Sequence, residues 1–292
     1  MTAAIVATST VPPRPRRSSS TVVIGLALCT EDLHRDLFGA QVLDGVIRTG
    51  MARGAAVVPW LSGDPTTNHT VRLPPDGIDG LVVDARSTAS PAVAALITSG
   101  VPTVVIGRGA GAAGCQVIDA DHTAGAEALM EHLVSLGRRR IAIICGGLQY
   151  FDSILRLDAY ERVRREAGLD LDPGLVAVGS FSVASGRRAM EQLLPLRPDA
   201  VFAMNDLMAL GALHVLQQAG LRVPDDVALA GFDDILDPDV SPIRLTSVRQ
   251  PARQLGERAV RALFDLLDGA VPGDDEIVPV ELVVHDSTYR PD

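Results

Sequence analysis

Polar and aromatic side chains follow many of the short apolar, β-branched runs of this chain. Most carry carboxylate, amide or guanidinium groups, which form paired hydrogen bonds with hydroxyl and amine groups. Ligands of parallel sheets bind beyond the carboxyl ends of the strands, where these side chains would gather. The set favours a polyhydroxylated or amine-bearing ligand with some ring stacking. Its members are Thr30, Asp32, Asp84, Arg108, Asp152, Phe181, Asn205, Asp206, Phe232, Asp233 and Asp234.

Two acidic residues of the chain also have a structural interpretation. Asp206 directly precedes a helical run, and we favour helix capping as its role. Asp121 beside His122 could serve acid–base chemistry, but we favour Asp121 as the cap of a helix that starts near Ala124.

Aromatic residues follow a glycine pair at one strand end. Tyr150 and Phe151 come just after Gly146 and Gly147. Exposed rings in such a loop either stack on a ligand or pack two lobes together, and the sequence leaves both roles open.

The motifs of several common enzyme sites are absent. The chain contains no GxSxG and no HExxH, and all 26 basic residues are Arg, so no lysine can form a Schiff base. Its three cysteines, Cys29, Cys115 and Cys145, lie far apart without the spacing of metal ligands. We therefore expect a protein that is not an enzyme and has no cofactor and no metal.

One glycine motif resembles a dinucleotide fingerprint. Residues 109–114 spell GxGxxG, but that fingerprint must open directly into a helix. Here Cys115–Ile118 follows, which is typical of another extended segment. We predict a loop without nucleotide binding.

Composition and charge limit the class of protein. The 292 residues suffice for two lobes with separate cores, and 47% of them are hydrophobic although only 3% are aromatic. The net charge of -10 makes the body a poor sequence-independent partner for nucleic acid. No apolar stretch approaches the length of a membrane span, and we interpret Val22–Leu28 as a buried strand rather than part of an export signal. We expect a cytoplasmic location without membrane contact.

Short apolar runs alternate with amphipathic stretches from Thr21 onward. This alternation predicts an α/β fold with two doubly wound, parallel-sheet lobes. The predicted strands are Val22–Leu28, Ala55–Trp60, Gly80–Val83, Thr103–Ile106, Ile141–Cys145, Leu175–Val178, Ala200–Met204 and Val227–Ala230. The predicted helices are Gln41–Arg53, Pro91–Ser99, Ala124–Leu136, Leu155–Ala167, Ala184–Leu194, Leu207–Ala219 and Ala252–Leu267.

Four stretches of the sequence carry specific motifs that can be compared with known protein families. They are Arg197–Asp234, with its Ala-Met-Asn-Asp and Gly-Phe-Asp-Asp motifs, Glu131–Ala142, Leu245–Pro251 and Glu281–Thr288. Together they resemble the LacI/GalR family of bacterial transcription regulators over about residues 21–290. The resemblance implies a type I periplasmic-binding-protein-like fold with three crossings between lobes. The implied N-terminal lobe is 21–140 plus 248–272 and the C-terminal lobe 141–247 plus 273–292, with 1–20 as a disordered arm.

The resemblance also implies a cleft that binds a sugar, polyol or nucleoside. Arg156 matches the cleft arginine of the family's Arg-x-x-Gly segment, although Ala159 replaces the glycine. Asn205, Asp233 and Phe181 match family positions in the cleft. With the strand-end residues, the candidate ligand-binding set is Arg156, Asn205, Asp233, Phe181, Asp84, Asp32 and Tyr150.

The N-terminal part departs from the family pattern. No helix-turn-helix precedes Thr21, and Pro12, Pro13 and Pro15 oppose a hinge helix. We therefore expect DNA binding only through a missing N-terminal helix-turn-helix or a partner. The function we predict is the effector-binding core of a LacI-type regulator, as a homodimer. A stand-alone cytoplasmic sensor or binding protein stays open as an alternative, and a sugar-acting enzyme as a weaker one.

Overall fold

The computed structural model describes residues 21–28, 36–61, 77–86, 94, 96–108, 114–169, 171–236 and 242–289. The arm 1–20, Asp32 and the loop 109–113 lie outside these residues, and the predicted helix Pro91–Ser99 is described only at 94 and 96–99.

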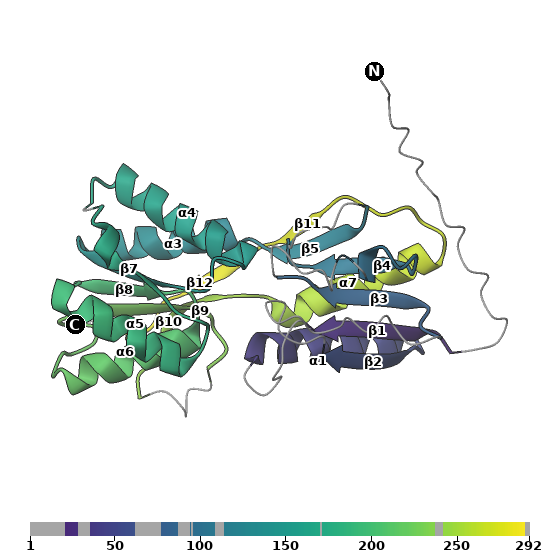
Figure 1. The fold of residues 1–292 in the computed structure, drawn as a ribbon, viewed down its shortest axis with the longest axis horizontal. Helices are drawn as coiled ribbons and strands as arrows, with labels where there is room; N and C mark the ends of the chain where they lie inside the picture. Colours follow the sequence, from purple (N-terminus) through teal and green to yellow (C-terminus); the bar gives the residue numbers. More distant parts are fainter. Residues whose placement is uncertain are drawn as a thin grey trace, which may run out of the picture.

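The described chain forms two lobes, each built on one six-stranded sheet (Figure 1). The first sheet has the order β11-β5-β4-β3-β1-β2 and the second β12-β10-β9-β8-β6-β7. Apart from β11 and β12, the two orders are equivalent, and every pair is parallel except β10 with β12. The predicted α/β fold with two doubly wound lobes is confirmed.

The strands agree closely with the predicted apolar runs. The first sheet contains β1 (Val23–Leu28), β2 (Ala56–Leu61), β3 (Gly80–Asp84), β4 (Thr103–Ile106), β5 (Gln116–Ala120) and β11 (Glu276–Val278). The second contains β6 (Ile141–Cys145), β7 (Val176–Val178), β8 (Ala200–Ala203), β9 (Ala228–Asp233), β10 (Thr246–Arg249) and β12 (Glu281–Val283). Strand β5 starts two residues after Gly114, so the GxGxxG motif does not open into a helix.

Helices cover the sheets, and several begin or end as the sequence predicts. The first lobe has α1 (Leu37–Ala52) and α7 (Ala252–Leu267). The second has α3 (His122–Ser135), α4 (Phe151–Glu166), α5 (Val183–Leu193) and α6 (Asp206–Gln218), with 3-10 turns at Pro173–Leu175 and Leu194–Leu196. The Asp121 carboxylate accepts from Ala124 N at 3.0 Å, which confirms its role as the cap of α3. Within the described ranges, no helix is long and apolar enough to cross a membrane.

The chain crosses between lobes at other places than the predicted boundaries. Helix α3 lies beside α4, and its Leu129 and Leu133 join the core of the second sheet (Figure 1). The first crossing therefore falls near Asp121 rather than near Arg140, because the apolar face of α3 is buried on the second lobe. Val248 of β10 also belongs to that core, whereas Val278 of β11 belongs to the core of the first sheet.

The apolar stripe of α1 is covered by its own chain. The side chains Val42, Val46 and Ala52 of this helix could in principle form a surface stripe at a dimer interface. Val42 and Val46 are instead fully buried and lie against Gly256 of α7, so the stripe does not supply such an interface. The stripe serves intramolecular helix packing, and a dimer must use another surface.

Helices α1 and α7 approach each other through glycines. A Cβ added to Gly45 would overlap the Arg253 carbonyl oxygen, and one added to Gly256 would overlap the Val42 carbonyl oxygen. In the second lobe, α5 and α6 meet in the same way through Gly186 and Gly211. Each lobe thus depends on one close helix pair whose spacing allows no side chain at the contact.

We predict that Gly45→Ala destabilises the protein by about 1–3 kcal/mol, because the contact is backbone and can relax only if the helices separate. Alanine favours helices over glycine, so a neutral or stabilising result would show that the spacing is not tight. Met51→Ala on the same helix is the control, since Met51 is 67% exposed and should change stability by less than about 0.5 kcal/mol. Chemical denaturation of both variants measures the difference.

Candidate functional site

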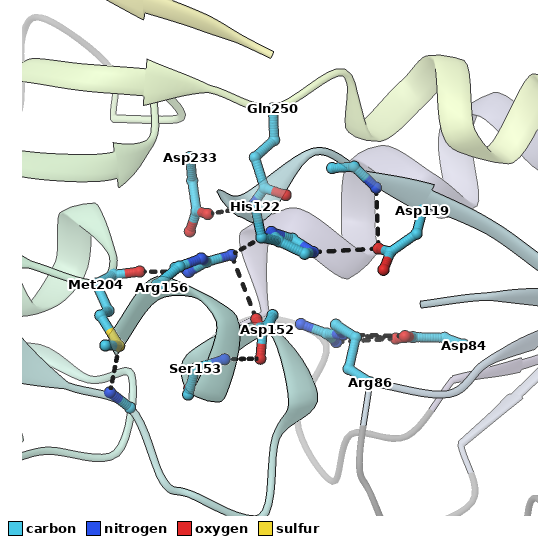
Figure 2. A network of polar contacts seen from close by, with 12 residues as sticks. Asp84, Arg86, Asp119, His122, Asp152, Ser153, Arg156, Met204, Asp233 and Gln250 are labelled. Atoms are coloured by element: carbon cyan, nitrogen blue, oxygen red, sulfur yellow. Dashed lines mark hydrogen bonds and ion pairs between the residues drawn. The ribbon is translucent and has the colours of Figure 1, made fainter. Parts of the chain in front are cut away.

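Charged side chains from both lobes meet where the lobes touch (Figure 2). We call this group the lobe junction, and it comprises Asp84, Arg86, Asp119, His122, Asp152, Arg156, Asp233 and Gln250. All of them lie at or just beyond the carboxyl ends of strands, or on the helix that follows one. The parallel order of both sheets brings them together, because it directs all these strand ends toward the junction.

Arg156 lies at the centre of the lobe junction and is 1% exposed. Its Nη1 donates to the Met204 carbonyl oxygen at 2.6 Å, and its Nη2 lies 3.2 Å from His122 Nδ1 and 3.3 Å from an Asp152 carboxylate oxygen. The guanidinium also lies over the Phe232 ring, 3.8 Å from its centroid. Asp152 and Arg156 share a face of α4 because they are four residues apart.

His122 connects the two lobes. It is the first residue of α3, and its Nε2 lies 3.1 Å from a carboxylate oxygen of Asp119 on β5. Asp119 belongs to the first sheet, whereas Arg156 belongs to the second lobe. A continuous chain of polar contacts therefore runs from Asp119 through His122 to Arg156 (Figure 2).

Asp233 is held by the second crossing between the lobes. Gln250 Nε2 donates to its carboxylate at 2.6 Å, and the Gln250 backbone N–H donates to its carbonyl at 3.3 Å. Its φ of 108° lies in a region that side chains other than glycine rarely adopt, so the surrounding contacts impose this conformation. Burial raises the pKa of Asp233 to about 6, against the attraction of Arg156.

Asp206 does not cap α6, so that interpretation of the sequence is wrong. Asn205 is the cap, and its Oδ1 accepts from Met208 N at 2.9 Å. The Asp206 carboxylate turns inward and accepts from Ser247 Oγ at 2.6 Å and Ile235 N at 2.9 Å. Burial, together with repulsion from Asp233, raises the pKa of Asp206 to about 8.

Asp84 belongs to an ion cluster on the first lobe. Arg86 Nε donates to Asp84 at 2.9 Å, and its Nη2 reaches Asp84 at 2.8 Å and Asp36 at 2.6 Å. The Arg86 carbonyl accepts from Phe151 N at 3.1 Å, which joins the two lobes directly. Burial raises the pKa of Asp84, whereas the two carboxylates raise that of Arg86 well above its usual range against the effect of burial.

Aromatic rings line the second lobe next to this network. Phe181 packs against Gly146, where a Cβ would overlap its ring, and the Tyr150 ring meets it edge-on with centroids 5.3 Å apart. Asn205 Nδ2 donates to the Phe181 carbonyl at 3.3 Å, so both polar ends of Asn205 have partners within the protein. Tyr150 thus contacts another ring of its own lobe.

The structure brings the predicted site residues together in three groups. Arg156 and Asp233 lie in the central network, Asp84 lies in the ion cluster of the first lobe, and Asn205, Phe181 and Tyr150 form the aromatic group. Asp32 is outside the described residues. Four side chains with clear roles at the junction were not predicted as site residues: Arg86, Asp119, His122 and Gln250. A search three residues beyond the predicted strand end at Val83 would have found Arg86.

Three buried polar atoms of this region have no hydrogen-bond partner within the described part of the chain. They are Arg156 Nε, Ser153 Oγ and Gln250 Oε1. Unpaired buried donors and acceptors are costly, so native proteins usually satisfy them with water or a ligand. The described residues hold no group of three His, Cys, Asp or Glu side chains suited to a metal ion. These atoms can donate hydrogen bonds to an uncharged polar ligand and accept hydrogen bonds from it.

The buried carboxylate of Asp206 gives a test by pH. Its pKa of about 8 in the folded protein lies far above the value of about 4 in an unfolded chain. The folded state therefore holds this proton more tightly, and the stability it contributes is lost as pH rises from about 4 to about 8. We predict that Asp206→Asn gains stability relative to wild type across this range, measured by denaturation at several pH values.

The control variant for this prediction, Asp226→Asn, should change in stability with pH in the opposite direction. The hydrogen bond from Arg222 lowers the pKa of Asp226, so Asp226→Asn should lose stability relative to wild type as pH rises through the acidic range. A stability difference between wild type and Asp206→Asn that does not change with pH would contradict the assignment of a buried, protonated Asp206.

Comparison with known proteins identifies a family model and relatives that match this chain. Residues 130–288 match the family model of the periplasmic binding protein-like domain. The chain is 37% identical over 211 residues to the HTH-type transcriptional regulator CelR of Thermobifida fusca, covering 71% of this chain and 61% of that protein. It is 34% identical over 233 residues to the ribose operon repressor of Escherichia coli K12, covering 78% of this chain and 71% of the repressor.

A solved structure of one of these relatives has a similar fold. The structure of a complex of the transcriptional regulator CelR with cellobiose superimposes with a TM-score of 0.81 at 29% identity, over 91% of this chain and 84% of that one. The matched part of this chain spans less than two thirds of the CelR length, 61%. The sequence matches and the two-lobed fold together show that the chain belongs to the LacI/GalR family of transcriptional regulators.

Proposed function

We propose that this chain is the effector-binding core of a LacI-type regulator and binds a sugar-like molecule at the lobe junction. The observation that carries the proposal is a set of three buried atoms at the junction, Arg156 Nε, Ser153 Oγ and Gln250 Oε1, that have no hydrogen-bond partner among the described residues. The names of its relatives support it, because one is a ribose operon repressor and another forms a complex with cellobiose.

Different residues of the site would contact different groups of the sugar. Asp233 accepts hydrogen bonds from ligand hydroxyls, and Arg156 donates from Nε, its one nitrogen without a partner in the described chain. Asp84 and Arg86 face them from the other lobe, so a bound sugar contacts both lobes and favours their closed arrangement. The rings of Phe181 and Tyr150 provide an apolar surface for the C–H face of a sugar.

The charge of the junction favours a neutral ligand over an anion. Asp84, Asp152 and Asp233 outnumber the guanidinium groups of Arg86 and Arg156, even before Asp36 and Asp119 are counted. A phosphorylated sugar would meet this excess of carboxylates in a low-dielectric site. We therefore place neutral sugars before sugar phosphates.

The wider role follows from the family. We propose that the chain acts in the cytoplasm without catalysis and that operator recognition belongs to a helix-turn-helix outside the two lobes or to a partner protein. The charge of -10 supports this assignment, since the two lobes themselves would repel a DNA duplex. The effector would then act by changing the arrangement of the lobes.

A sugar that binds at the junction should raise the melting temperature. At a concentration about a hundredfold above Kd, binding contributes about 2.7 kcal/mol, which corresponds to a shift of a few degrees. We predict such a shift with cellobiose, ribose or another neutral sugar in a thermal-shift screen, and none with the corresponding sugar phosphate.

The site assignment is tested by Asp233→Asn, which keeps the shape of the side chain and can still accept from Gln250. We expect about a tenfold to hundredfold weaker affinity by calorimetry, because a hydrogen bond to a charged group contributes about 1.5–3 kcal/mol. Asp225→Asn is the matched control, since Asp225 pairs with exposed Arg222. Equal affinity of both variants for the sugar would refute the role of Asp233.

We also propose that the chain forms a homodimer, as expected from the family. The outer edge of β2 is unpaired within the described part of the first sheet, and its Val58 is exposed. An unpaired apolar edge is a surface that proteins usually cover. We predict a mass of about twice 30.7 kDa by light scattering at micromolar concentration, and Val58→Glu should shift it toward the monomer. A monomeric wild type at that concentration would contradict the proposal.

A further inference from the structure

His122 uses both nitrogens of its ring. Nε2 lies 3.1 Å from the Asp119 carboxylate, which can only accept, and Nδ1 lies 3.2 Å from Arg156 Nη2, which can only donate. Both contacts are hydrogen bonds in one form alone, the neutral ring with its proton on Nε2. The ring is 6% exposed, so water does not replace Asp119 or Arg156 as its hydrogen-bond partner.

The groups around His122 come from three elements. Asp119 lies on β5, Asp152 and Arg156 lie on α4, and Asp233 follows within the same network at the end of β9. The Phe232 ring of β9 lies 6.2 Å from the imidazole, centroid to centroid, and also lies under the guanidinium. Arg156 is the positively charged group in direct contact with His122 among the described residues.

The contact with His122 determines how Arg156 is oriented. Nη1 is fixed by the Met204 carbonyl, and Nη2 is shared by His122 and Asp152. With both terminal nitrogens engaged, the guanidinium plane cannot turn, and Nε is left without a partner in the described chain. Loss of the His122 acceptor would free Nη2 to turn toward Asp152 and move Nε away from its present direction.

We propose that neutral His122 is a positioning residue for Arg156, and that its protonation weakens effector binding. The proposal rests on the proposed function, in which Arg156 Nε binds the ligand. A protonated ring carries N–H at Nδ1, so it can no longer accept from Arg156 and places a second positive charge beside the guanidinium. Between about pH 5 and 8, the range in which histidine side chains in general change charge, the proposal can be tested by experiment.

The first test needs no ligand. The ¹⁵N signals of a histidine-labelled full chain distinguish the two neutral tautomers and the protonated ring, and the spectrum of His122→Asn identifies the His122 signals by their loss. We expect the neutral ring with the proton on Nε2 at about pH 8. A proton on Nδ1 at that pH would overturn the proposal, whatever the ligand proves to be.

The second test uses two amide variants that separate the roles of the two nitrogens. The Oδ1 of asparagine occupies the position of Nδ1 and can accept from Arg156, whereas the amide of glutamine occupies the position of Nε2 and can donate to Asp119. With the neutral sugar that gives the largest thermal shift, we expect His122→Asn to bind within about threefold of wild type and His122→Gln to bind about tenfold or more weakly. An equal loss in both variants indicates a merely structural role and overturns the proposal.

The pH profile of affinity completes the test. Asp233, with a pKa of about 6, titrates in the same range, so wild type alone cannot report on His122. We expect affinity to fall more steeply from about pH 8 to about pH 5 in wild type than in His122→Asn, which keeps Asp233 but lacks the imidazole. Parallel profiles would contradict the proposal. If Asp233→Asn binds normally, the site of the proposed function fails, whereas the tautomer result still decides the state of His122.

Discussion

A guanidinium that is 1% exposed must find acceptors within the protein, and most of the lobe junction can be understood from this requirement of Arg156. The Met204 carbonyl, His122 and Asp152 meet it from the end of β8 and from the helices α3 and α4. His122 in turn relies on Asp119 in the other lobe. The charge that belongs to one lobe is therefore stabilised in part by the other, so a change in lobe arrangement alters the environment of Arg156.

The two equivalent sheets explain why this network can form. Each lobe has the order of strands that places polar strand ends at one edge, and the three crossings turn those edges toward each other. Gln250 lies on the second crossing and binds Asp233, so the linker itself contacts a proposed ligand residue. The close glycine contacts of α1 with α7 and of α5 with α6 hold each lobe as a compact unit. Effector binding can then act on the junction while the lobe interiors stay fixed.

Much of the fold was predictable because it depends on local patterns. The apolar run Ile141–Cys145 is fully buried as a strand between two neighbours, and the glycine after α3, Gly137, has the positive φ expected of a helix end. The boundaries between lobes were not predictable in this way, because α3 could cover either sheet and only its contacts with α4 decide the matter.

The candidate site was predictable in composition but not in its connections. Asp84, Arg156 and Asp233 lie at the junction, where the strand ends predicted Asp84, the family resemblance predicted Arg156, and both predicted Asp233. The exchange of roles between Asn205 and Asp206 could not be predicted, because either side chain can cap a helix and the choice depends on Ser247, 41 residues away. His122 was paired with its neighbour Asp121 in the sequence, whereas in the fold its carboxylate partner is Asp119.

The central claim is that an effector binds between the lobes and contacts Arg156 and Asp233. The most direct measurement is a crystal structure of the full chain with the neutral sugar that gives the largest thermal shift. The predicted result is a sugar at the lobe junction with hydroxyl oxygens about 3 Å from Arg156 Nε and from the Asp233 carboxylate. A sugar bound elsewhere, with the Arg156 environment unchanged and Nε still without a partner, would contradict it.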